Sequence, residues 1–532
     1  MAAQRLPQRL PLGHRANNKI LMLTNAERGE ANVFLATCHA LLEADPGLEL
    51  HFATFDGLQQ TVAQVSDNVR RAVPHAKPIV FHQIKGPTMT ESIMQHLARN
   101  CIPRKADGSP ESWMTPLRFF SSLRAIRDTI PIIVPYRGSQ LVDIISYIAA
   151  IIEEVAADLV VVDSLMTPGL TACYHLGIKF TCLSPNNIKM FAGPAQPWLA
   201  SLWKWPALFS GYPYPVPLHL IPFNLCLIIY MVIIWRRDAH RRQATDYLLA
   251  QIGAHLFTPI DLARRRLPDL KILVSTHSEL DFPLVHPPHV YPCGPIVRAA
   301  PAIADADPEL LTWLARGPTV YINLGSFFSV DQDQALELAQ ALKIALDTLD
   351  KKPGADHVQV LWKLKLCKDP CVGNGVFPIL DTLSRQFEDG RIRIVEWVQA
   401  EPISILQSGH IACSVHHGGA NSYNEAVIAG VPQVVLPQWS DCYDYAELVQ
   451  VLGIGRLGSK TTKPRWTAPE LSHELLAVLD GEPARAMTHK AQQLASLCEK
   501  RGSGAAKAAR ILLEELSNEP EVLMEKTSVN GG

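Results

Sequence analysis

Short apolar runs alternate with stretches of helical periodicity through the first part of the chain. The pattern predicts strands over 18–24, 51–55, 158–163 and 179–183, and helices over 31–42 and 168–176. A strand, a helix and a second strand in this order indicate parallel pairing in an α/β layer. The strand over 158–163 is apolar throughout its middle, which is typical of a strand buried on both faces.

The second half of the chain repeats this alternation. It predicts strands over 319–323, 358–363, 392–395, 411–415 and 434–436, and helices over 331–348 and 421–429. Gly430 follows the last of these helices and is expected to cap its C-terminus. A string of the form G-x-G-x-x-G at 453–458 follows a helix-like segment and opens no helix, so we expect a loop there and no dinucleotide site.

A proline-rich connection between Pro287 and Pro301 separates the two α/β units, and we place a domain boundary near residue 297. A chain of 532 residues favours two domains, since single cores stop growing at roughly 250–300 residues. Two such domains leave a ligand cleft at the carboxyl ends of their strands. We expect a loose leader over 1–17, domains over 18–297 and 298–485, helices over 486–517 that cross back to the first domain, and a flexible tail over 518–532.

One segment, 218–235, is almost wholly apolar and is followed by four arginines between 236 and 242. A membrane-spanning helix needs about 20 apolar residues, whereas Pro222 and Asn224 leave an unbroken run only over 225–235. Tryptophans and a proline-rich turn precede it, as in a membrane-interface belt or the wall of an apolar pocket. Three interpretations stay open: a core or pocket wall, a contact with a membrane surface, and a true span.

The composition narrows the class of protein. Apolar residues make up 48% and charged residues 19%, which suits a folded globular chain. Lys plus Arg is 49 and Asp plus Glu is 51, so no basic surplus points to a nucleic-acid partner. The eleven cysteines are scattered, and the nearest pair, Cys367 and Cys371, lacks zinc-knuckle spacing. We interpret them as reduced thiols of a cytoplasmic protein.

The densest candidate chemistry lies between Trp397 and Asp441. His417 and two glycines stand between a buried strand and a helix start, where free backbone N–H groups form an anion site and the histidine adds a donor to a phosphate. Glu425 is placed to take a sugar diol in a two-pronged hydrogen bond. Trp397 follows another strand and offers a flat surface for a base.

This stretch resembles the signature of the UDP-glycosyltransferase family, the family 1 inverting glycosyltransferases of the GT-B fold. That signature is a Trp, a His-Gly/Cys-Gly-x-Asn-Ser-x-x-Glu run, Gly-Val-Pro, a Pro and Asp-Gln. The matching positions are Trp397, His417-Gly418-Gly419-Ala420-Asn421-Ser422, Glu425, Gly430-Val431-Pro432, Pro437 and Asp441. The resemblance extends to residues 321–326 and 361–363, and the spelling of 24–32 resembles fungal members that act on secondary metabolites or lipids.

The resemblance implies two Rossmann-like α/β domains that face each other across a cleft, with the acceptor in the first and the UDP-sugar in the second. By resemblance, Trp397 stacks on uracil, and His417 and Ser422 hold the diphosphate. Glu425 binds the ribose and Asp441 the donor sugar. The donor-binding set implied in this way is Ser326, Trp397, Val398, Gln399, His417, Gly419, Asn421, Ser422, Glu425, Asp441 and Cys442.

The chain departs from the family pattern at two sites. The family's catalytic histidine follows a glycine in the first loop, and here Gly29 is followed by Glu30; Asp163 stands where the family places the aspartate of its catalytic pair. Two close carboxylates do not both ionise easily, so Glu30 with a raised pKa is our hypothesis for the base. In the donor site, Cys442 replaces the usual Gln, and Gln399 is the candidate substitute for another missing Gln.

We therefore expect a UDP-dependent enzyme that moves a sugar, glucose by resemblance, with inversion onto a hydroxyl of a small apolar acceptor such as a secondary metabolite. We expect neither a metal nor a cofactor beyond the UDP-sugar co-substrate, because helix N–H groups and hydroxyls can stabilise the leaving diphosphate. Two alternatives remain. One is a sterol or lipid glycosyltransferase at a membrane surface, and the other is a UDP-sugar-binding subunit without catalytic activity.

Overall fold

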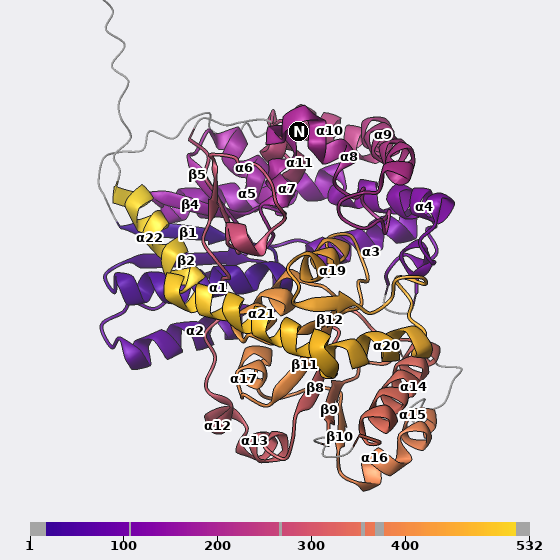
Figure 1. The fold of residues 1–532 in the computed structure, drawn as a ribbon. Coiled ribbons are helices and arrows are strands. Elements are labelled where there is room, and N and C mark those ends of the chain that lie inside the picture. The colour runs from indigo at the N-terminus through magenta and orange to yellow at the C-terminus, as the bar shows by residue number, and fades with distance from the viewer. Residues whose placement is uncertain (1–17, 106–107, 265–268, 353–356, 368–376, 518–532) are drawn as a thin grey trace, which may run out of the picture.

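The structure is a computed structural model that describes residues 18–105, 108–264, 269–352, 357–367 and 377–517. Two parallel β-sheets, each with helices on both faces, form two lobes that face each other (Figure 1). The predicted leader over 1–17 and the predicted tail over 518–532 lie outside the described residues. The prediction of two Rossmann-like α/β units is confirmed.

The first lobe contains a seven-stranded sheet in which every neighbouring pair is parallel. Its order is β3-β2-β1-β4-β5-β6-β7. The strands are β1 (Lys19–Leu23), β2 (Glu49–Thr54), β3 (Val80–Gln83), β4 (Leu159–Asp163), β5 (Phe180–Ser184), β6 (Ile272–Val274) and β7 (Val290–Pro292). The helices are α1 (Arg28–Ala44), α2 (Gln59–Ala72), α3 (Met89–Arg99), α4 (Phe119–Thr129), α5 (Gly138–Val155), α6 (Thr167–Leu176), α7 (Lys189–Ala192), α8 (Ala200–Trp203), α9 (Ile221–Arg237), α10 (Ala239–Ile252) and α11 (Pro259–Arg264).

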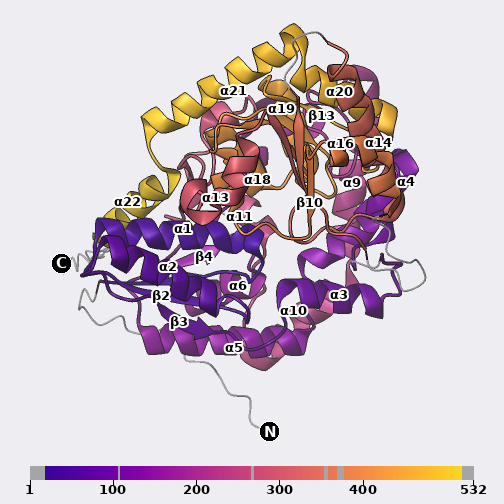
Figure 2. The ribbon, with the colours of Figure 1, turned by 90° about the horizontal axis from the view of Figure 1, so that it is seen from below.

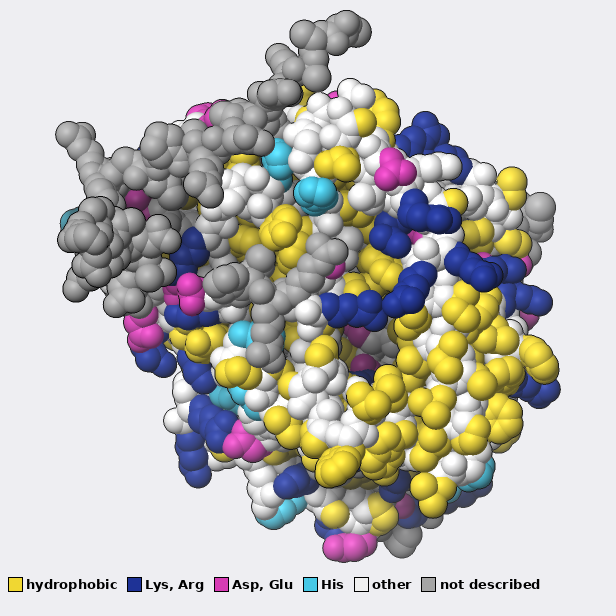
Figure 3. Space-filling view, turned by 90° about the horizontal axis from the view of Figure 1, so that it is seen from above, with side chains coloured by type: hydrophobic (Ala, Val, Ile, Leu, Met, Phe, Trp, Pro, Cys, Tyr) yellow, Lys and Arg dark blue, Asp and Glu magenta, His cyan; other side chains and the backbone are white. Residues whose placement is uncertain are grey.

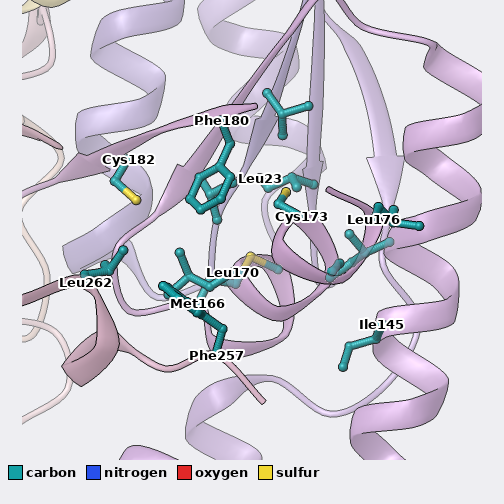
Figure 4. Close-up of a cluster of buried hydrophobic side chains, with 14 of the residues drawn as sticks. Leu23, Ile145, Met166, Leu170, Cys173, Leu176, Phe180, Cys182, Phe257 and Leu262 are labelled. Atoms are coloured by element: carbon teal, nitrogen blue, oxygen red, sulfur yellow. The ribbon is translucent and has the colours of Figure 1, made fainter. Parts of the chain in front are cut away.

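The core of this lobe lies between the central strands and α5 and α6. Leu23, Leu170 and Phe180 meet there from β1, α6 and β5 (Figure 4). The thiols of Cys173 and Cys182 are buried among them, and burial raises the pKa of Cys173 to about 12. Such thiols behave as small apolar side chains, in line with the interpretation that the cysteines are reduced.

The second lobe contains a six-stranded parallel sheet in the order β10-β9-β8-β11-β12-β13. Its strands are β8 (Thr319–Asn323), β9 (Gln359–Lys363), β10 (Ile392–Val395), β11 (Ile411–His416), β12 (Gln433–Val435) and β13 (Gly455–Leu457). The helices are α12 (Ile303–Ala306), α13 (Pro308–Leu314), α14 (Gln332–Leu349), α15 (Phe377–Thr382), α16 (Ser384–Glu388), α17 (Pro402–Leu406), α18 (Ala420–Ile428), α19 (Cys442–Val451) and α20 (Ala468–Leu479).

In both sheets the strand order reverses next to the first strand. This reversal falls between β1 and β4 in the first lobe and between β8 and β11 in the second. In open parallel sheets, ligands bind outside the carboxyl ends of the strands at such a reversal. The fold therefore indicates two ligand-binding regions: the segments after β1 and β4, and the segments after β8 and β11.

Two sequence predictions need correction. Residues 455–457, predicted as loop, form the edge strand β13. A Cβ on Gly455 would come within 2.2 Å of the Gln433 carbonyl oxygen, so the glycine permits the close approach to β12 and does not signal a loop. The start of the proline-rich connection forms β7, an edge strand that tolerates Pro292. The domain boundary near 297 follows β7 and stays a prediction.

The last two helices connect the lobes. The helix α21 (Gly481–Arg501) packs on α18 in the second lobe, whereas α22 (Gly504–Ser517) lies along α1 in the first (Figures 1 and 2). The chain thus crosses from the second lobe to the first at the break after Arg501, whereas the sequence predicted that the crossing helices begin at residue 486. The buried Glu515 on α22 forms ion pairs with Lys179 and Lys271 of the first lobe.

Candidate active site

The first lobe fixes a buried carboxylate at the end of β4. Asp163 is fully buried, and the loop after β1 holds it: its Oδ2 accepts hydrogen bonds from the Asn25 backbone N–H at 3.1 Å and the Asn25 side chain at 2.9 Å. Its Oδ1 accepts from the Leu165 N–H at 2.8 Å. Burial raises the pKa of Asp163 to about 6, although these donors oppose the shift.

Glu30 lies in the first turn of α1, and its carboxyl group is within hydrogen-bonding reach of Asp163. Burial and the charge of Asp163 raise the pKa of Glu30 well above its usual value. One proton shared between the two groups satisfies this contact, with protonated Glu30 donating to ionised Asp163. The structure therefore brings together the two residues that the sequence predicts as the catalytic pair.

Two polar groups near this pair were not predicted. The hydroxyl of Tyr136 is buried and has no hydrogen-bond partner among the described residues, and burial, followed by the charges of Glu27 and Asp163, raises its pKa. Glu27 accepts two hydrogen bonds from Thr90 through one oxygen, while the other is buried without a donor. Tyr136 belongs to no motif and reaches the site only through the fold, so the sequence carried no signal for it.

The second lobe builds an anion site where β11 meets α18. Gly418 has φ +90, and a Cβ there would come within 2.7 Å of the Cys442 carbonyl oxygen. A Cβ on Gly419 would come within 2.5 Å of His417 Nε2. These clashes explain the two glycines. The N-cap residue Gly419 has no side chain that could cap α18, and no capping bond is seen within the described part of the chain, so the first N–H groups of the helix are available to a ligand.

His417 fills the space between the two central strands of this sheet. A Cβ on Gly325, after β8, would come within 2.9 Å of its ring. Burial lowers the pKa of His417 to about 3, with smaller effects from His416 and Lys363. The ring is therefore neutral, and its Nδ1 has no hydrogen-bond partner in the portion of the chain that the structure describes. By contrast, His416 pairs with Gln433 at 2.8 Å and is structural.

Further along α18, the helix presents the other predicted donor-binding residues. Burial, and next the charge of Glu401, raise the pKa of Glu425 to about 8, so it carries a proton at neutral pH and can both donate and accept. Ser422 is half-buried near the start of the helix. The Asn421 side chain donates to the carbonyl of Gly29 at 3.2 Å, which ties the donor side to the first lobe.

Trp397 follows β10 and is 57% exposed. Two cations face its ring: Lys363 Nζ lies 4.3 Å and the Arg28 guanidinium 5.5 Å from the ring centroid. Burial and the neighbouring positive charges of Lys365 and Arg28 lower the pKa of Lys363. Arg28 comes from the first lobe and was not predicted. Its position at the start of α1 gave no indication that it reaches Trp397.

Asp441 lies where the two lobes meet. It borders a cavity of about 280 Å³, and burial raises its pKa to about 6. Its charge also contributes, after burial and the charge of Asp163, to the raised pKa of Glu30, so Asp441 and the carboxyl pair influence each other electrostatically. Other lining residues are Met190, Phe209 and Tyr212 of the first lobe and Tyr443 and Asp444 of the second. An apolar compartment thus opens beside the predicted sugar-binding carboxylate.

The remaining predicted residues differ in how well they are placed. Ser326 is exposed after β8, and its carbonyl oxygen accepts from Lys365 Nζ at 2.8 Å. Val398 is half-buried and Gln399 is exposed, whereas the thiol of Cys442 is fully buried. Within the described ranges, no three His, Cys, Asp or Glu side chains are arranged to hold a metal ion.

Solved structures share this two-lobed arrangement. A UDP-glucosyltransferase from Polygonum tinctorium superposes with a TM-score of 0.57 at 17% identity, covering 94% of this chain and 99% of that one. Phytolacca americana UGT2, in complex with UDP-2-fluoro-glucose and pterostilbene, gives 0.56 at 17% identity, covering 94% and 98%. The fold is therefore GT-B, with two Rossmann-like domains that face each other.

Sequence comparison supplies the family. Residues 384–500 match the family described as Erythromycin biosynthesis protein CIII-like, C-terminal domain. The glycosyltransferase sdnJ of Sordaria araneosa is 31% identical over 477 residues, which cover 88% of this chain and 89% of that protein. The chain belongs to the UDP-glycosyltransferase family, family 1, and is a glycosyltransferase.

Proposed function

We propose that the enzyme moves glucose from UDP-glucose, with inversion, onto a hydroxyl group of a small apolar secondary metabolite in the cytoplasm. One observation carries the proposal: the buried Glu30–Asp163 pair of the first lobe is electrostatically coupled to Asp441 of the second, and Asp441 borders an apolar cavity. The pterostilbene and UDP-2-fluoro-glucose bound by Phytolacca americana UGT2 support a small aromatic acceptor and a UDP-sugar donor.

The donor would bind along the carboxyl end of the second sheet. Its uracil would stack on Trp397, its ribose would bond Glu425, and its diphosphate would meet the free N–H groups of α18. Neutral His417 donates one N–H to a phosphate oxygen, and Ser422 and Ser326 add hydroxyls. Because these donors can stabilise the charge of the leaving UDP by hydrogen bonds, we propose transfer without a metal or a further cofactor.

The acceptor hydroxyl must lose its proton as it attacks the anomeric carbon. Glu30 already holds one proton in its contact with Asp163, so two transfers are coupled. The acceptor proton passes to Glu30 while the proton of Glu30 passes to Asp163, whose pKa of about 6 makes it an adequate acceptor. The C–O bond to the acceptor forms as the bond to UDP breaks, on the opposite face of the sugar, through an oxocarbenium-like transition state.

The acceptor would lie in the cavity that Asp441 borders. Phe209 and Tyr212 line it from the segment that precedes the apolar run over 218–235, and no residue of that run is among the described lining residues. A cavity of about 280 Å³ suits a small ring system. Asp441 would contact both the donor sugar and the entrance to the acceptor compartment.

The test is transfer followed by mass spectrometry. Purified protein receives UDP-glucose or other UDP-sugars with phenols, sterols or hydroxy-fatty acids, in the presence of EDTA. We expect a product heavier by one hexose, with the inverted anomeric configuration by NMR. A product that forms only with another UDP-sugar corrects the donor, and a product that EDTA abolishes overturns the metal-independent mechanism.

A second candidate is a UDP-sugar-binding subunit without catalytic activity, which the glutamate in the place of the family's histidine favours. UDP binding by calorimetry without transfer or donor hydrolysis would establish it. A third candidate, a sterol or lipid glycosyltransferase at a membrane surface, is favoured by the exposure of α9, of whose residues only Asn224 and Leu227 are buried.

A further inference from the structure

The first lobe exposes a broad apolar surface around α9. The stretch Leu218–Ile252 is the one helical region of the described chain that is long and apolar enough to cross a membrane by length and composition. Its most apolar window has a mean hydropathy of 2.1, yet only 11% of that window is buried. Figure 3 shows the hydrophobic side chains gathered on this side of the molecule. In the core helix of a soluble protein, most of such a window would be buried.

The apolar surface extends beyond α9 itself. The ring of Phe119 on α4 contacts the rings of Phe120 and Phe223 edge to face, with 5.5 Å between ring centroids in each pair. The helix α8 also packs against α9. We call this surface the α9 face; its large side chains come from α4, from α9 and from the segments that directly precede α8 and α9. Its most exposed members are Trp198, Leu218, Phe120, Leu199, Ile229 and Phe223. Contiguous apolar patches of this kind mark binding surfaces.

The helix is placed to lie along a surface and not to span a bilayer. Its 17 residues extend about 25 Å, whereas the hydrocarbon core of a bilayer is about 30 Å thick. Its inner side is fixed to the protein. Asn224 is buried and bonds Ala207, Leu202 and Trp205, and Leu227 is buried beside it. Only the outer side is free to enter an apolar phase.

Unpaired arginines border the α9 face. Arg236 and Arg237 end α9, and Arg118 and Arg124 flank Phe120 on or next to α4; all four are exposed. No ion pair to any of them occurs within the described part of the chain. Figure 3 shows Lys and Arg side chains along the edge of the apolar area and few acidic ones. Such a border complements a negatively charged surface.

We propose that the α9 face inserts into the interfacial layer of an anionic membrane and that the acceptor enters the cavity beside Asp441 from the lipid. The segment after α8 connects the two: Ala207 and Phe209 line the cavity and pack against Leu227 of α9. The route, though not the docking, rests on the proposed function. A second copy of the chain is a poorer fit, because a two-fold contact would bring the arginine borders together.

The first experiment is flotation with vesicles of phosphatidylcholine alone or with phosphatidylserine. We expect binding to the mixed vesicles, at least about 10-fold weaker binding to the neutral ones, and loss of the difference at high salt. Trp198→Glu should abolish binding, and the pair Arg236→Glu with Arg237→Glu should reduce it about 10-fold. The matched controls lie on the second lobe and on α21: exposed Ile344→Glu and Lys500→Glu should bind as the parent does.

Three results would overturn docking. They are no flotation of the parent, equal loss with Ile344→Glu, and a concentration-dependent dimer in light scattering that Trp198→Glu converts to monomer. The route has its own readout. With acceptor dissolved in vesicles, Trp198→Glu should lower kcat/KM about 10-fold while a water-soluble acceptor turns over as before. If Trp198→Glu turns over both acceptors as fast as the parent does, the route is overturned and docking stands. If the parent transfers sugar to neither acceptor, the proposed function is overturned, and the flotation result is unaffected.

Discussion

The two lobes build their halves of the site in different ways. In the second lobe, the predicted diphosphate and ribose ligands lie at one strand–helix junction, from His417 just after β11 to Glu425 on α18, while Trp397, Ser326 and Asp441 follow other elements. The first lobe collects Glu30, Asp163 and Tyr136 from three separate segments. A nucleotide diphosphate is bound by backbone N–H groups and a few near neighbours, so a short motif suffices. The acceptor half depends on tertiary contacts, and its chemistry can change without any change in the motif.

The lobes also use burial differently. In the second lobe, burial leaves His417 and Glu425 neutral, with pKa values of about 3 and about 8, so both act as hydrogen-bonding groups and not as charges. In the first lobe, burial raises the pKa of both Glu30 and Asp163, which favours one proton held between the two carboxyl groups. In the proposed mechanism, the donor half therefore binds and the acceptor half moves a proton. Substitutions in each should separate these two roles.

The largest effect is expected from Glu30→Gln. The amide keeps the shape but cannot take the acceptor proton, so kcat should fall about 10²–10⁴-fold while the Kd for UDP stays within about twofold. Steady-state kinetics and calorimetry measure both. The matched control is Glu43→Gln, at the exposed end of the same helix, with unchanged kcat. Full turnover by Glu30→Gln would remove Glu30 from the mechanism.

His417→Ala should act in the opposite way, on binding. It removes a buried donor to the diphosphate, which costs about 1.5–3 kcal/mol and weakens UDP binding about 10–100-fold. His417→Asn, which keeps an N–H donor, should recover part of the loss. The exposed His489→Ala serves as control. UDP affinity unchanged in His417→Ala would show that the diphosphate lies elsewhere.

Arg28→Ala tests whether the lobes share the nucleotide. Its guanidinium faces Trp397 from the first lobe, and such contacts are worth about 0.5–2 kcal/mol, so UDP binding should weaken about 2–30-fold. Lys363→Ala should weaken it to a similar degree, with a reduced dependence on salt. The exposed Arg124→Ala is the control. An effect of Lys363 without one of Arg28 would confine nucleotide binding to the second lobe.

The smallest effect is expected from Glu425→Gln, on the way in which the stability of the folded protein depends on pH. The pKa of Glu425 is about 8 in the folded chain and near 4.5 when exposed, so between these values the folded state holds a proton that the unfolded state has lost. Its contribution to stability therefore falls as pH rises from about 4.5 to 8. Glu425→Gln should flatten the decline in Tm of the ligand-free protein by about 2 °C or more. Glu499→Gln, exposed on α21, should leave the slope unchanged, and an identical slope for Glu425→Gln would place that carboxylate in solvent.

Much of the architecture could be read from local spacing alone. The strands over 319–323 and 392–395 have the predicted bounds, and the junction of β11 with α18 forms where the His-Gly-Gly run places it. The sequence predictions were wrong where a glycine or proline is explained by a contact with a distant strand and not by a local turn. Gly455 suggests a loop until β12 is seen beside it, and Pro292 suggests a linker until its strand is found at a sheet edge.

The sequence by itself determined the order of strands and helices, the donor motif and the absence of the usual histidine, because each is a matter of residue type and spacing along the chain. Only the tertiary structure decided which distant groups meet. The Asn421 side chain bonds Gly29 across 392 residues of sequence, and Glu30 meets Asp163 through the pairing of β1 with β4. It also decided that α9 faces outward, since an apolar run has the same composition whether protein, lipid or water covers it, and only its packing partners distinguish the three.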